Sequence, residues 1–129
     1  MGRRYSDQAK AQLLSQINDP EAIALINEAD DPVYWAERHF YDPDEGKNQF
    51  RAKRMFHEFL RCPRKNRSAR IGRQAGKTVH FTVDLMHTGT FNSNAIILVF
   101  VPSKKNMDRT LEIMSNLLMQ SDLKSSFQV

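Results

Sequence analysis

The sequence predicts an α/β fold in which a βαβ unit with parallel strands follows a helical N-terminal arm. Three consecutive patterns support this prediction. Residues 68–71 can form a short buried strand, residues 78–91 carry apolar side chains at helical spacing, and residues 95–101 are an unbroken apolar run. A run rich in Ile, Val and Phe is typical of a strand buried on both faces, as in a parallel sheet. We therefore expect strand, helix and strand in this order across the middle of the chain.

The turn between the first strand and the helix carries a phosphate-binding motif. Residues 70–78 read Arg-Ile-Gly-Arg-Gln-Ala-Gly-Lys-Thr. Gly76 lets the backbone approach phosphate oxygens, and Lys77 can reach the β- and γ-phosphates of a triphosphate. The Thr78 hydroxyl is placed to ligate Mg²⁺. The usual motif has its first glycine where Ile71 stands, so an ordinary βαβ unit with a solvated lysine is the alternative.

Several segments between residues 30 and 120 resemble the N-terminal ATPase portion of the large terminase subunit of tailed phages. Residues 31–37 look like the aromatic helix that precedes the nucleotide site in that family, and residues 99–105 look like its next strand and turn. Residues 73–78 are similar to its deviant Walker A loop, in which an Arg four residues before the Lys is a hallmark. The family usually reads adenine with an aromatic-Gln pair ahead of the loop, but residues 50–56 contain no Gln.

The resemblance implies a P-loop NTPase-type core that binds ATP and Mg²⁺, with Thr78 as the metal ligand and Arg73 and Lys77 as catalytic residues. The implied nucleotide-binding residues are Gly72, Arg73, Gln74, Ala75, Gly76, Lys77 and Thr78. The parent protein would be an ATPase that drives double-stranded DNA into a procapsid, in the cytoplasm of the infected bacterial host. Its implied partners are the portal and the small terminase subunit, with a ring oligomer of the full-length protein and no membrane.

We expect the chain to be divided into two structural parts. Residues 1–47 would form the helical arm and residues 48–129 the N-terminal part of the ATPase domain, divided by a polar loop. Hydrolysis needs a strand that ends in acidic residues, and no apolar run here ends in Asp or Glu. We therefore expect the Walker B strand and a nuclease domain beyond Val129, and little turnover by this chain alone. The alternatives are a fragment of a helicase-like or other P-loop NTPase, and a nucleotide-binding or assembly module that does not hydrolyse.

Several helices begin at recognisable caps. Asp19 and Asp31 each precede a proline, which is the pattern of an acidic N-cap followed by Pro at the first helical position. Ser103 is expected to cap a helix over about residues 104–120. The predicted apolar stripe of that helix consists of Met107, Leu111, Met114 and Leu118. Another helix face, made by Phe56, Phe59 and Leu60, is expected in the core, with an adenine platform as the alternative.

Basic residues are concentrated around the motif. The chain has a net charge of +4 and a pI of about 9.4, and ten Lys or Arg residues lie from Arg51 to Lys77 against the single acid Glu58. Such a segment favours polyanions, so direct contact with DNA and a solvated helix face are both open. The only cysteine, Cys62, excludes an internal disulfide. The four histidines lack metal-ligand spacing and are expected at the surface.

Overall fold

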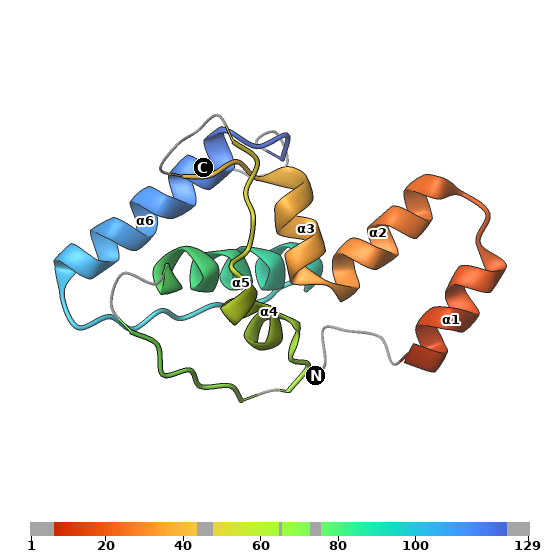
Figure 1. Ribbon diagram of the computed structural model, residues 1–129, viewed down its shortest axis with the longest axis horizontal. Coiled ribbons are helices and arrows are strands. Elements are labelled where there is room, and N and C mark those ends of the chain that lie inside the picture. The colour runs from red at the N-terminus through yellow and green to blue at the C-terminus, as the bar shows by residue number, and fades with distance from the viewer. Residues whose placement is uncertain (1–6, 44–47, 65, 73–75, 124–129) are drawn as a thin grey trace.

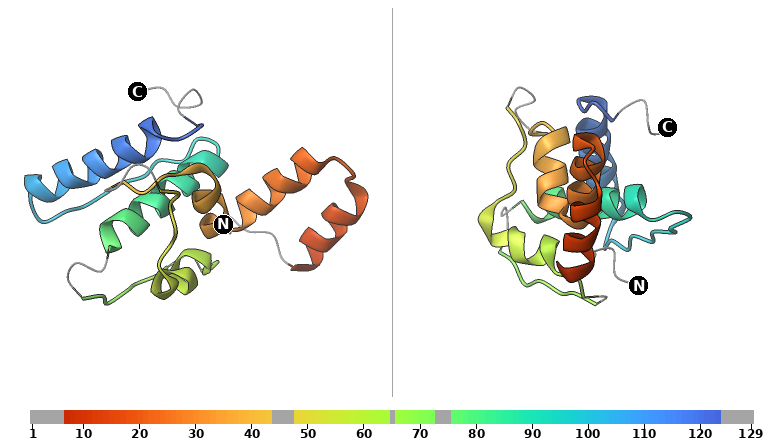
Figure 2. Two further views of the ribbon diagram at one scale, coloured as in Figure 1. Left: turned by 45° about the horizontal axis from the view of Figure 1, so that its top comes forward. Right: turned by 90° about the vertical axis from the view of Figure 1, so that its right-hand side faces the viewer.

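The computed structural model describes residues 7–43, 48–64, 66–72 and 76–123, and these residues form a helical fold (Figure 1). The helices among them are α1 (Asp7–Gln16), α2 (Pro20–Asp30), α3 (Pro32–His39), α4 (Arg54–Arg61), α5 (Lys77–Phe91) and α6 (Lys104–Met119). Helix α5 lies at the centre, and α3, α4 and α6 each pack against it. Helices α1 and α2 extend away from this group (Figure 2). Helix α2 joins it mainly through α3 and also through a hydrogen bond between the Glu28 carbonyl and His87 of α5.

The predicted α/β fold with a P-loop NTPase-type parallel sheet is wrong. The described residues contain no sheet, and their strand-type pairing is limited to an isolated antiparallel bridge between Tyr41 and Gln49. Residues 68–71 and 95–101, the two predicted strands, are irregular. A strand is stabilised by backbone hydrogen bonds to a neighbouring strand, and no described segment supplies such a neighbour to either stretch.

Residues 95–101 keep the side-chain alternation of a strand without its pairing. Ile96, Leu98 and Phe100 are between 73% and 90% exposed, whereas Ile97 and Val99 are only 37–38% exposed. The two less exposed side chains line a cavity of about 290 Å³ with residues of α5 and α6. The predicted burial on both faces is therefore also wrong, because one side of this segment contacts the helices and the other is open to solvent.

The predicted helix starts are confirmed. Pro20 and Pro32 are the first residues of α2 and α3, and each follows an aspartate whose carboxylate accepts a backbone N–H two residues later at 3.0 Å. Ser103 is the N-cap of α6, and its hydroxyl accepts the backbone N–H of Asn106 at 3.4 Å. Each cap satisfies a backbone donor that the first helical turn leaves without an intrahelical acceptor.

The buried face of α6 differs from the predicted stripe. Leu111, a member of that stripe, is 54% exposed, whereas Ile113, Leu117 and Leu118 are buried. The buried residues all lie in the second half of the helix, so α6 joins the core through that half. Residues 113, 114, 117 and 118 form this face, because side chains three and four positions apart share one side of a helix.

The core lies between α3, α4, α5 and the second half of α6. Trp35 of α3 is 1% exposed, and its ring makes edge contacts with Phe40, His87 and Phe91 at centroid distances of 5.0–6.0 Å. Phe56 and Leu60 of α4 are fully buried in the same core, so they do not form an exposed adenine platform. The predicted domain boundary between residues 47 and 48 stays a prediction. Within the described residues no helix combines the length and apolar character that crossing a membrane requires.

Candidate phosphate-binding site

The structure places the end of the predicted phosphate loop at the start of α5. Gly76 is the N-cap of this helix and has a left-handed backbone conformation with φ of +86°, which glycine adopts without steric cost. As a glycine, Gly76 has no side chain with which to cap this end. Lys77 and Thr78 are the first two residues of the helix. Backbone N–H groups and the helix dipole at such an end favour an anion.

The other predicted nucleotide-binding residues do not strengthen this arrangement. Gly72 is exposed, and a Cβ built on it would meet nothing within 4 Å. The nucleotide-binding role of Gly72 stays a prediction. Arg73, Gln74 and Ala75 lie outside the described residues. Gly76, Lys77 and Thr78 are thus the part of the predicted set that the structure brings together.

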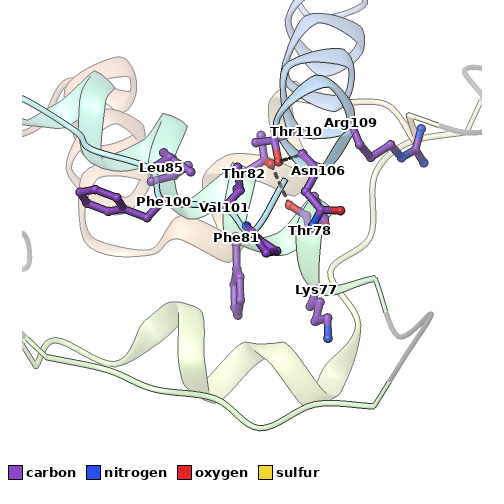
Figure 3. A pocket seen from close by; sticks show the side chains of 12 residues that line it. Lys77, Thr78, Phe81, Thr82, Leu85, Phe100, Val101, Asn106, Arg109 and Thr110 are labelled. Carbon is purple, nitrogen blue, oxygen red and sulfur yellow. Dashed lines mark hydrogen bonds between the residues drawn. The ribbon is translucent and has the colours of Figure 1, made fainter. Parts of the chain in front are cut away.

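A pocket of about 470 Å³ opens beside the first turn of α5 (Figure 3). Its polar part contains Lys77 and Thr78 of α5 and Asn106, Arg109 and Thr110 of α6. Its apolar part is formed by Phe81 and Leu85 and by residues 99–102 before α6. Lys77 projects from the end of α5, away from α6 (Figure 3). Among the described residues that line this pocket none is acidic, so they supply no carboxylate for water activation or for Mg²⁺.

His80 of α5 is buried behind this first turn, with 3% of its surface exposed. Its Nδ1 lies 2.7 Å from the carbonyl oxygen of Gly76, and its Nε2 lies 3.0 Å from the backbone nitrogen of Lys53. A backbone N–H only donates and a carbonyl only accepts, so Nδ1–H donates to Gly76 and Nε2 accepts from Lys53. The predicted surface position of the histidines is wrong here and for His87, which is fully buried.

The surroundings of His80 favour its neutral form. Burial is the main cause that lowers the pKa of His80 from its ordinary value of 6.5, and the nearby charges of Lys53 and His57 lower this pKa further. The hydrogen bond to the Gly76 carbonyl acts in the opposite direction and is outweighed. The neutral ring is the form that both hydrogen bonds require, since a protonated Nε2 cannot accept from Lys53.

Six of the ten basic residues from Arg51 to Lys77 fall into two groups. Three of them contact carboxylates: Arg51 with Glu37 at 3.5 Å, Arg61 with Asp31 at 3.1 Å and Arg67 with Asp84 at 2.9 Å. Another three are exposed and form no ion pair within the described part of the chain: Arg54, Arg64 and Arg70. The second group is the one whose charge is available to a polyanion.

Sequence reasoning missed Lys53 and His80 as residues near the candidate site. The spacing of His80, four residues after Gly76, is a signal for the contact within α5, because positions i and i+4 are neighbours on a helix. The contact with Lys53 joins residues far apart in the sequence and has no local signal. No group of three His, Cys, Asp or Glu that could hold a metal is found among the described residues.

No protein-family model, curated protein or solved structure matches this chain.

Proposed function

We propose that this chain binds the phosphates of a nucleoside triphosphate, ATP with Mg²⁺, at the start of α5. The observation that carries the proposal is left-handed Gly76, which has no side chain to cap α5, immediately before Lys77 and Thr78 at the start of this helix. Backbone N–H groups, the helix dipole and one ammonium group then act on the same anion. The pocket of about 470 Å³ next to this end gives room for a ligand larger than phosphate.

Each residue has a separate task in this proposal. The Lys77 ammonium would bind oxygens of the β- and γ-phosphates, and the Thr78 hydroxyl would ligate a Mg²⁺ ion that offsets their negative charge. Arg73, by the resemblance of the loop, stabilises negative charge on the γ-phosphate during transfer. The described residues lining the pocket provide no general base, so we expect this chain to hydrolyse ATP negligibly by itself.

The resemblance of the loop extends the proposal to the parent protein. The chain would be the ATP-binding portion of a large terminase subunit, which packages double-stranded DNA in the host cytoplasm with the portal and the small terminase subunit. The helical fold removes the support that a parallel sheet would have given, and residues 99–101, which resemble the family's next strand, are irregular. The loop and residues 31–37 therefore carry this part of the proposal. The alternative is a module that binds a nucleotide without hydrolysing it. This alternative agrees with a pocket whose described lining residues include no Asp or Glu.

The number of phosphates on the ligand tests the phosphate assignment. In calorimetric titrations with Mg²⁺, affinity should rise from AMP through ADP to ATP, and pyrophosphate should displace ATP. This order follows because the proposed contacts are all with phosphate oxygens. Equal affinity for adenosine and ATP, or no binding of any of these ligands, would show that the start of α5 is not a phosphate site.

A second function, binding of double-stranded DNA, is favoured by the three exposed arginines that form no ion pair in the described residues, Arg54, Arg64 and Arg70. They lie in α4 and in the segment that leads from α4 towards α5. Arginine side chains bind the phosphate backbone without regard to sequence, as a packaging motor would require. We propose this segment as the surface that contacts DNA.

A further inference from the structure

Lys53 brings a second cation to the start of α5. Its Nζ lies 3.3 Å from the position that a Cβ on Gly76 would occupy. Lys53 and Gly76 also line a common cavity of about 100 Å³, together with His80, Arg51 and the acidic residue Asp42. This cavity lies next to the helix N-cap and shares none of its lining residues with the larger pocket between α5 and α6. Two ammonium groups therefore belong to this region: that of Lys77, the first residue of α5, and that of Lys53, the residue before α4.

A single imidazole fixes the backbone on both sides of this cavity. His80 donates to the carbonyl of Gly76 and accepts the N–H of Lys53, so its ring spans the two segments. The ring itself is held by stacking on Phe56, with centroids 4.0 Å apart and planes 10° apart. Because Phe56 is fully buried in α4, the position of His80 is set by the core. One buried side chain thus connects the backbone of Lys53 to that of Gly76.

We propose that Lys53 is a second phosphate-binding cation of the nucleotide site and that His80 is the positioning residue that holds it beside Gly76. This inference rests on the proposed function, since it names a further contact with the phosphates of the same ligand. A triphosphate carries several negative charges, and two ammonium groups from different segments can approach different phosphate oxygens. The phosphates would then join α4 to α5 through the Lys53 and Lys77 side chains.

A double-mutant cycle on the full chain separates positioning from a merely structural role. Lys53→Met removes the ammonium group and keeps the alkyl chain, and His80→Phe keeps an aromatic ring against Phe56 but removes both hydrogen bonds. We expect each variant to lower the MgATP affinity, Lys53→Met by about tenfold. In the Lys53→Met background, His80→Phe should change the affinity by less than about twofold, because its effect acts through the missing ammonium group. Lys105→Met, which removes an exposed ammonium group of α6 in the same way, is the matched control and should leave the affinity within about twofold.

The outcomes distinguish this inference from the proposed function. Full affinity in Lys53→Met together with weak binding in Lys77→Ala would overturn the role of Lys53 and leave the phosphate site in place. If the loss of MgATP affinity in the double variant equals the product of the two single losses, His80 acts on the fold and not through Lys53. If His80→Phe does not fold, His80→Gln tests the role by rescue, because its side-chain amide can still accept the N–H of Lys53 and should keep the wild-type affinity. A folded His80→Gln variant that loses as much affinity as Lys53→Met would overturn the positioning role. Unchanged affinity for MgATP in all of these variants, including Lys77→Ala, would overturn both proposals.

Discussion

The imidazole of His80 lies flat against the ring of Phe56, with ring centroids 4.0 Å apart and an angle of 10° between the planes. This stack joins the first turns of α5 to the buried face of α4. It also keeps His80 away from water, next to the carbonyl of Gly76. The start of α5, where the phosphate site is proposed, is thus fixed by a histidine in the core.

The first prediction concerns the dependence of stability on pH. The pKa of His80 lies below 6.5 in the folded protein, mainly because the ring is buried, so the unfolded chain takes up a proton more readily than the folded one. The contribution of His80 to the free energy of unfolding should be complete above about pH 6.5 and should be lost as the pH falls below that value. Urea unfolding of the wild type and His80→Phe at several pH values measures this contribution to the free energy of unfolding. A wild-type slope between pH 6.5 and 5 no steeper than that of the variant would contradict the prediction.

Gly76→Ala should destabilise the protein by about 1–2 kcal/mol, because the left-handed backbone at φ of +86° is unfavourable for a residue with a Cβ. The new methyl group would also lie 3.3 Å from Lys53 Nζ and 3.6 Å from the His80 ring. Gly72→Ala is the matched control, since its Cβ would meet nothing within 4 Å. Thermal unfolding of both variants measures the difference. Equal stabilities of the two variants would show that the conformation of Gly76 is not required.

Thr78→Ala should weaken ATP binding by roughly 1 kcal/mol when Mg²⁺ is present and much less when EDTA has removed it. The reason is that the proposed task of the Thr78 hydroxyl is to ligate the metal. Thr90→Ala, at the exposed far end of α5, removes the same hydroxyl away from the site and should have no effect on affinity. A loss for Thr78→Ala that is the same with and without Mg²⁺ would assign the hydroxyl to another role.

The DNA-binding surface can be tested by the salt dependence of binding. Replacing Arg54, Arg64 and Arg70 together by alanine should weaken the binding of a short DNA duplex and reduce the slope of log K against log[salt] by about one for each arginine. Arg61→Ala is the control, because Arg61 already contacts Asp31 and should change the slope less. Fluorescence anisotropy across a salt series provides the slopes. A triple variant with the wild-type slope would exclude this segment as the DNA surface.

The sequence predicted local structure well and long-range structure poorly. The caps at Asp19, Asp31 and Ser103 could be predicted because a cap depends on neighbouring residues alone. The run of residues 95–101 has the composition of a buried strand, but a sheet also requires a neighbour, which no local pattern in this chain specifies. The prediction of an α/β fold failed at that step.

The candidate site shows the same division. Gly76, Lys77 and Thr78 form one continuous stretch, so the sequence could predict that they lie together at the start of a helix. Lys53 and His80 are 27 residues apart, and their contact depends on how α4 packs against α5. Local spacing cannot supply that packing. The histidines were expected at the surface because they lack metal-ligand spacing, and His80 is buried.

The most direct test of the phosphate site is the calorimetric affinity for MgATP of Lys77→Ala, compared with Lys105→Ala. Both variants remove one exposed ammonium group from the first turn of a helix, but Lys105 does not line the pocket beside Thr78. We predict that Lys77→Ala loses roughly 1.5–3 kcal/mol of binding free energy, the value of a charge-assisted contact with phosphate, while Lys105→Ala binds as the wild type does. Equal affinities of the wild type and Lys77→Ala would contradict the proposal that the start of α5 binds a triphosphate.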